Sequence, residues 1–185
     1  IPFIDGKASV SQIGRGEKTI KIFKSGFSLY ILISVLFYFK ISSFFFLNKV
    51  ENKFKLCGLL ANFFLLIYIF ALGREEAVFE ILRRLAIIFY IVNIYINHIY
   101  LTKILKLLRS EKKLQLNRIY SIIFYIIITF MTVLIIIGSP WVNPLFKYPN
   151  ELKNIIEWNY FLLTIIFYIP VSSMFYQLNK EKIKI

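Results

Sequence analysis

Residues 73–113 read GREEAVFEILRRLAIIFYIVNIYINHIYLTKILKLLRSEKK, and the interpretation of the whole chain starts from this stretch. It opens with charges of both signs, contains no charged residue between Arg84 and Lys103, and ends in a basic amphipathic turn. A run of about 20 mostly apolar residues is what a helix needs to cross the hydrocarbon layer of a bilayer. The stretch therefore predicts a membrane-spanning helix over residues 82–101, with its Lys/Arg-rich end in the cytoplasm or an equivalent compartment.

The composition of the chain agrees with this interpretation. Its 185 residues are 58% hydrophobic, and its mean hydropathy of +0.69 is far above that of soluble domains of this length. A net charge of +13 would suggest nucleic acid as the partner of a soluble protein. Here the basic residues lie in short segments between apolar runs, so membrane topology explains them and we expect no nucleic-acid partner.

The apolar runs predict an all-α, polytopic transmembrane helix bundle that forms a single domain over residues 1–185. The basic segment Asn48–Lys55 and the segment Lys103–Arg118 are expected to be turns. Gly138–Asn154 is expected to be a non-helical exterior loop with Trp141 at headgroup level, and Pro170 is expected to kink the last span. The chain begins with Ile1 rather than Met, so a sixth span preceding Ile1 is left open. The five expected spans are about 25–47, 56–72, 82–101, 119–137 and 158–178.

The positive-inside rule predicts the orientation. With five spans, the segments 48–55, 102–118 and 178–185 share one side and carry 12 Lys and Arg residues. The segments on the other side, 1–24, 73–84 and 139–157, carry 10. We therefore expect the C-terminus on the cytoplasmic side and residue 1 outside.

Polar residues recur along one face of the third predicted span. Their spacings of three and four place them on one helical stripe, which we expect to face the interior of the bundle. The stripe suits hydrogen bonds between helices, or alternatively a cavity lined for lipid or substrate. A similar stripe on the fourth span is Ser121, Tyr125, Thr129 and Thr132. The stripe on the third span is Arg83, Ala86, Tyr90, Asn93, Asn97 and Tyr100.

The single histidine and the single cysteine restrict the chemistry of the chain. His98 cannot clamp a haem with a second histidine of this chain, and we expect it near the inner membrane interface, bonded to a backbone carbonyl or a headgroup. Cys57 has no cysteine partner for a disulfide or a metal site. We therefore expect no metal and no cofactor.

Charged residues are densest at the outer end of the third predicted span. Glu80 precedes Arg83 by three residues and Arg84 by four, so these side chains can pair along one helix. Charges at a membrane edge are costly unless they are paired, so the cluster is either a structural clasp or a site for lipid headgroups. No nucleophile with an adjacent base accompanies it, so we expect no enzymatic activity. The candidate headgroup site is Arg15, Lys24, Glu76, Glu80, Arg83, Arg84 and Glu157.

Three short motifs carry a resemblance to a known family. They are Pro2-Phe3-Ile4-Asp5 followed by Ser9 and Ser11, then Ile22-Phe23-Lys24, and Glu157-Trp158 at the expected start of the last span. Their order resembles the Frag/DRAM/Sfk-type family of polytopic membrane proteins, which includes autophagy modulators and GPI-anchor remodelling factors. Asp5 stands where that family has Ser, and Lys24 where Arg is usual. The resemblance implies six spans and a non-enzymatic role in handling membrane lipids or lipid anchors.

Two functions are compatible with these features. The first is a lipid-handling membrane protein whose partners are membrane lipids. The second is a structural accessory subunit of a larger membrane complex, in which the polar stripes and loops contact other membrane subunits.

Overall fold

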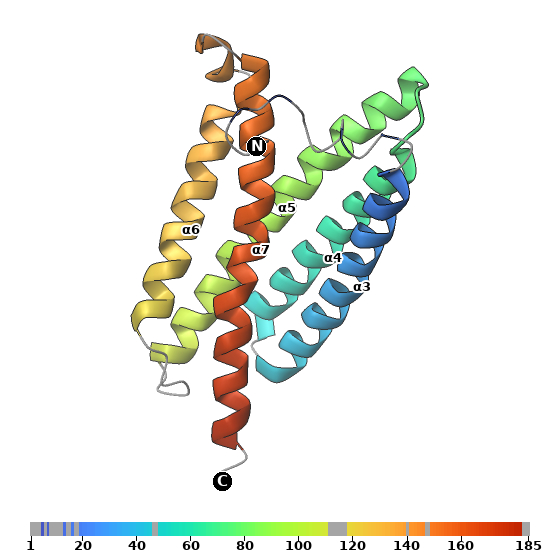
Figure 1. Ribbon diagram of the computed structural model, residues 1–185. Helices are drawn as coiled ribbons and strands as arrows, with labels where there is room; N and C mark the ends of the chain where they lie inside the picture. Colours follow the sequence, from blue (N-terminus) through green and yellow to red (C-terminus); the bar gives the residue numbers. More distant parts are fainter. Residues whose placement is uncertain are drawn as a thin grey trace. The chain divides into compact units, whose positions relative to one another are not determined.

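The computed structural model describes residues 5, 7, 13, 16, 19–45, 48–110, 118–139, 141–146 and 149–182. Within them the chain is all-α, with no strand. The long helices are α3 (Ile20–Phe45), α4 (Asn48–Ala71), α5 (Ala77–Ser110), α6 (Arg118–Ile137) and α7 (Pro149–Lys182), and a short 3₁₀ helix, η1, covers Asn143–Leu145 (Figure 1).

Four of these helices are long and apolar enough to cross a membrane. The qualifying stretches are Ile20–Ser43, Asn52–Ala71, Ile119–Ile137 and Asn150–Ser173. This supports an integral, multi-pass membrane protein. α5 is not among the four, so a fifth crossing at residues 82–101 stays a prediction.

Several helices extend beyond the expected spans, because polarity marks where a membrane ends rather than where a helix ends. α3 begins at Ile20, before the expected start of the first span at about residue 25. The expectation that Asn48–Lys55 is a turn is wrong, because this segment forms the first turns of α4. Lysine and glutamate are good helix formers, so this polar segment continues the helix. α5 likewise extends into the expected loop as far as Ser110.

The last helix begins earlier than expected. α7 starts at Pro149, where a proline suits the first helical position because its missing N–H needs no partner there. The end of the expected loop Gly138–Asn154 is therefore helical, and Glu157-Trp158 lies inside α7 rather than at its start. The helix continues through Pro170.

The chain divides into two compact units. The N-terminal unit is Val10–Leu101, and the C-terminal unit is Thr102–Ile185 with Ile1–Ser9. In the C-terminal unit α6 and α7 pack side by side through the rings of Phe124 and Phe167, whose centroids lie 5.1 Å apart, and Tyr120 Oη lies 3.0 Å from Ser173 Oγ (Figure 1).

In the N-terminal unit α3 and α4 form an antiparallel hairpin (Figure 1). The Phe27 and Tyr68 rings meet near one end, with centroids 6.2 Å apart, and the Tyr38 and Phe54 rings meet near the other at 5.5 Å. Gly58 makes this approach possible, because a Cβ at this position would lie 2.6 Å from the Tyr38 ring. The hairpin is thus fixed by ring packing over a small residue, as is usual between membrane helices.

α5 follows α4 in the opposite direction. The Phe64 and Phe89 rings stack with centroids 4.8 Å apart, and further along, Asn97 Nδ2 donates to the backbone carbonyl of Phe54 over 2.7 Å. Both contacts lie within the N-terminal unit, so α3, α4 and the first part of α5 belong to one compact unit and alternate in direction.

Candidate functional site

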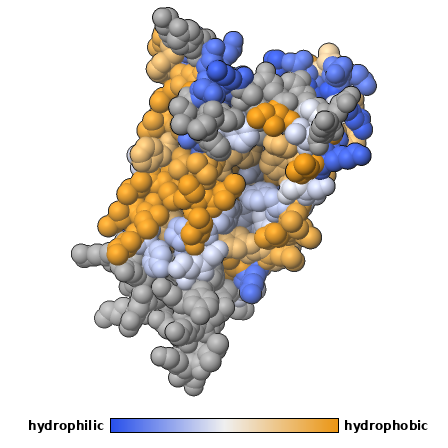
Figure 2. Space-filling model, viewed as in Figure 1, coloured by the Kyte–Doolittle hydropathy of each residue, from blue (hydrophilic) through white to orange (hydrophobic). Residues whose placement is uncertain are grey.

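The turn between α4 and α5 is the charged end of the N-terminal unit. Figure 2 shows hydrophilic residues gathered where α4 ends and α5 begins, and hydrophobic residues along the helices. Gly73 takes φ +87°, a conformation that side-chain-bearing residues avoid, and a Cβ here would also overlap Ile20. Gly73 therefore lets the chain leave α4 and reverse direction close against the start of α3.

Arg83 folds back from α5 onto this turn. Its Nη1 donates to the carbonyl of Ala71 over 3.0 Å and to the carbonyl of Arg74 over 2.5 Å. The residue is only 7% exposed. The last carbonyls of a helix lack partners within the helix and carry partial negative charge, so a guanidinium placed there caps α4.

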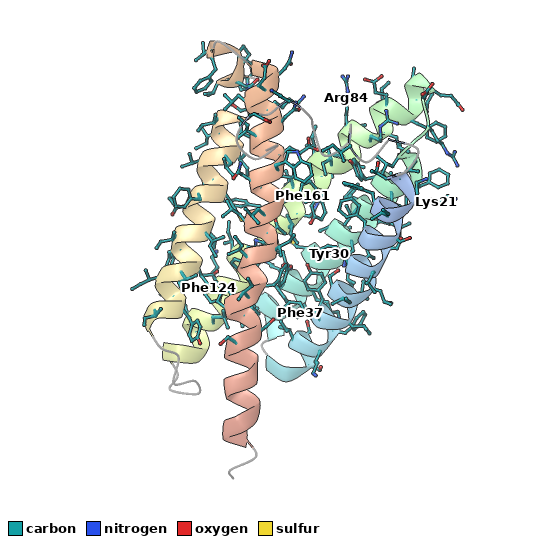
Figure 3. The ribbon with its side chains drawn as sticks, viewed as in Figure 1. Lys21, Tyr30, Phe37, Arg84, Phe124 and Phe161 are labelled. Carbon is teal, nitrogen blue, oxygen red and sulfur yellow. The ribbon has the colours of Figure 1, made fainter. Side chains whose placement is uncertain are left out.

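Arg84, the next residue, lies in a different environment. Its Nη2 donates to Glu80 Oε1 over 2.5 Å, and the two side chains are 75% and 50% exposed. Figure 3 shows Arg84 pointing away from the helix at the charged end. The expectation that Glu80 pairs with Arg83 as well as Arg84 is wrong, because Arg83 is turned toward the carbonyls of the preceding helix.

Arg74, which is not among the predicted site residues, also belongs to the charged turn. Its guanidinium carbon lies 4.1 Å from the centroid of the Phe70 ring and 4.4 Å from that of the Phe79 ring. The flat guanidinium is thus held by cation–π contact with two rings from two helices. The four-residue spacing between Phe70 and Arg74 was the available signal, but the contact with Phe79 depends on the turn.

The remaining residues of the candidate headgroup site are Glu76, Lys24, Arg15 and Glu157. Glu76 is exposed at the start of α5, where its backbone carbonyl accepts the N–H groups of Phe79 and Glu80. Lys24 is half-buried on α3, and Arg15 lies outside the described residues. Glu157 is half-buried on α7 in the C-terminal unit.

The polar stripe of α5 is largely buried. Tyr90 and Asn97 are 1% and 0% exposed. Asn97 bonds to α4, as described above, and Tyr90 Oη lies 3.5 Å from Tyr30 Oη of α3, a loose contact. Asn93 is half-buried and donates to the carbonyl of Phe89 in its own helix, and Tyr100 is half-buried.

His98, Ser34 and Asn62 add further buried polar groups. His98 is fully buried on α5. Ser34 Oγ donates to Asn62 Oδ1 over 2.8 Å, which links α3 to α4 at a point where both residues are buried. This pairing was not predictable from the sequence, because nothing in a single helix indicates which neighbouring helix it meets.

The expectation that the polar stripe of the fourth span faces the bundle interior is wrong in part. Tyr125 is 51% exposed and Thr129 is also exposed. Thr129 donates to the carbonyl of Tyr125 and Thr132 to that of Ile128, both in their own helix. The buried side of α6 carries apolar residues instead, among them Phe124, Ile127 and Met131.

No metal centre is visible in the part of the chain that the structure describes, where histidine, cysteine, aspartate and glutamate form no group of three or more. No protein-family model, curated protein or solved structure matches the chain. The geometry of the charged turn therefore carries the functional argument.

Proposed function

We propose that this chain is a non-enzymatic integral membrane protein that handles membrane lipids or lipid anchors by contacting headgroups at the α4–α5 turn. The observation that carries the proposal is the exposed pair Arg84–Glu80 beside the ring-held Arg74, at the end of apolar helices. Headgroups lie at that level of a membrane, and exposed guanidinium groups attract their phosphates. Kinship with the Frag/DRAM/Sfk-type family is part of the same proposal.

The proposal includes a fifth crossing by α5. Contacts between α4 and α5 run in antiparallel order, from Ala71 with Arg83 to Phe54 with Asn97. Fourteen residues of α5 separate those contacts, which is about 21 Å at 1.5 Å per residue. Since the contacted part of α4 is a candidate span, α5 would extend over much of the same depth.

An exposed apolar stripe on α5 supports the same interpretation. Ile81, Leu85, Ile88 and Val92 are 60%, 48%, 54% and 45% exposed, and their spacings of four, three and four place them on one helical face. A continuous apolar face is stable against lipid tails rather than water. With five crossings, the positive-inside rule gives a cytoplasmic C-terminus and an exterior α4–α5 turn.

Native mass spectrometry after extraction in mild detergent tests the function. We expect a monomer or small homo-oligomer that retains lipid, and we expect Arg84→Ala to lower the retained lipid several-fold. Lys40→Ala is the matched control, because Lys40 is an exposed cation near the opposite end of α3. Equal retention by both variants would contradict the proposal, and release only within a fixed-stoichiometry complex would favour an accessory subunit.

A further inference from the structure

Arg83 and Arg84 are neighbours in sequence but differ in burial. The Arg84 side chain is 75% exposed and forms a salt bridge with Glu80. Arg83 is 7% exposed, and among the described side chains no carboxylate lies within ion-pair distance of it. A cation this buried at the end of a membrane helix is costly without a counter-charge.

The described contacts of Arg83 use only part of its guanidinium. Both hydrogen bonds leave from Nη1, toward the carbonyls of Ala71 and Arg74. Within the described residues no acceptor meets Nη2 or Nε. The C-terminal end of a helix supplies only about half a negative charge, so the carbonyls fix the position of the guanidinium without neutralising it.

The unused edge of the guanidinium defines the ligand chemistry. Nε–H and Nη2–H form a planar fork that matches two oxygens of one phosphate or carboxylate, and such bidentate pairs are among the strongest hydrogen bonds in proteins. At the end of a membrane helix the most abundant group with that geometry is the phosphate of a lipid headgroup. Arg74, held between two rings, adds a second cation at the same turn.

We propose that Arg83, anchored through Nη1 on the end of α4, binds one phosphate group of a lipid headgroup through its remaining N–H groups. This rests on the proposed function and makes it more specific. The exposed Arg84 provides general attraction, whereas the buried Arg83 recognises the phosphate. Diacylglycerol, which has the same acyl chains and no phosphate, is then a poor ligand.

The test uses the whole chain in mild detergent, titrated with phosphatidylglycerol or with diacylglycerol of the same acyl chains and read by native mass spectrometry. We expect at least tenfold tighter binding of phosphatidylglycerol. Arg83→Lys should weaken that binding about tenfold, because an ammonium group can still donate to the carbonyls but offers no planar fork. Lys40→Ala should bind as the wild type does.

Inorganic phosphate as a competitor identifies the source of the phosphate. If millimolar phosphate displaces phosphatidylglycerol, the site recognises the phosphate group itself, and the free ion is a ligand as well as the lipid. Lipid discrimination without displacement supports recognition of the phosphate on a lipid. Equal binding of the two lipids by the wild type overturns the proposal.

The two proposals fail in different ways. If Arg84→Ala lowers lipid retention and Arg83→Lys does not, the headgroup function stands and the Arg83 site is wrong. A wild type that retains no lipid contradicts both. If Arg83→Lys does not give a monodisperse helical protein, the two lipids are compared on Arg84→Ala, which keeps Arg83: tighter binding of phosphatidylglycerol by this variant supports the Arg83 site, and equal binding of the two lipids contradicts it.

Discussion

Asn97 of α5 donates a hydrogen bond to the backbone carbonyl of Phe54 of α4 over 2.7 Å, with Asn97 fully buried. The contact fixes the middle of α5 against the beginning of α4, as Arg83 on Ala71 fixes the first turns of α5 against the end of α4. A side-chain amide inside a membrane protein stabilises a helix pair by supplying a polar contact that lipid cannot replace. The polar stripe of α5 thus acts first as a connection between helices.

Asn97→Ala should destabilise the N-terminal unit by about 1 kcal/mol, because the bond to the neighbouring helix is lost. The measurement is the unfolding free energy in detergent or bicelles. Asn93→Ala is the control, since the hydrogen bond described for Asn93 is to Phe89 of its own helix. Equal destabilisation by both variants would show that the contact between α4 and α5 contributes nothing specific.

Gly58→Ala should destabilise the α3–α4 hairpin by about 1–3 kcal/mol, because the new methyl group would meet the Tyr38 ring. Gly26→Ala is the matched substitution on α3, where a Cβ meets no atom within 4 Å. It should stabilise the protein by about 0.5–1 kcal/mol through helix propensity. Thermal unfolding of the two variants side by side checks the prediction, and a neutral Gly58→Ala would refute it.

The Glu80–Arg84 pair should contribute little to stability although its geometry is good. Both side chains are at least half exposed, and a double-mutant cycle of exposed pairs gives under about 1 kcal/mol. We therefore expect Glu80→Ala and Arg84→Ala to unfold as the wild type does while Arg84→Ala retains less lipid. A coupling energy above about 2 kcal/mol would make the pair a structural clasp instead.

Sequence periodicity located the polar stripe of α5, in which Tyr90 and Asn97 are buried, but not what these two residues contact. The stripe containing Tyr90 and Asn97 could be located because polar side chains repeat at helical spacing between apolar ones. Their partners Tyr30 and Phe54 lie 60 and 43 positions away in the chain, and no local pattern encodes that distance.

The candidate site, too, could be predicted from the sequence only in part. The pair of Glu80 and Arg84 follows from a four-residue spacing on one helix and was predictable. Arg83 looked equally able to pair with Glu80, but the turn at Gly73 brings the carbonyls of Ala71 and Arg74 within its reach. A buried guanidinium satisfies those carbonyls better than water does at a membrane edge, and this depends on tertiary structure.

Cysteine labelling at the two ends of α5 most directly tests a membrane-spanning N-terminal unit. In a Cys57→Ala background, Glu75→Cys reports on the exposed α4–α5 turn and Lys106→Cys on the exposed far end of α5. With an impermeant maleimide on intact cells, we expect Glu75→Cys to be labelled from outside and Lys106→Cys only after permeabilisation. Labelling of both cysteines from the same side would show that α5 does not cross the membrane.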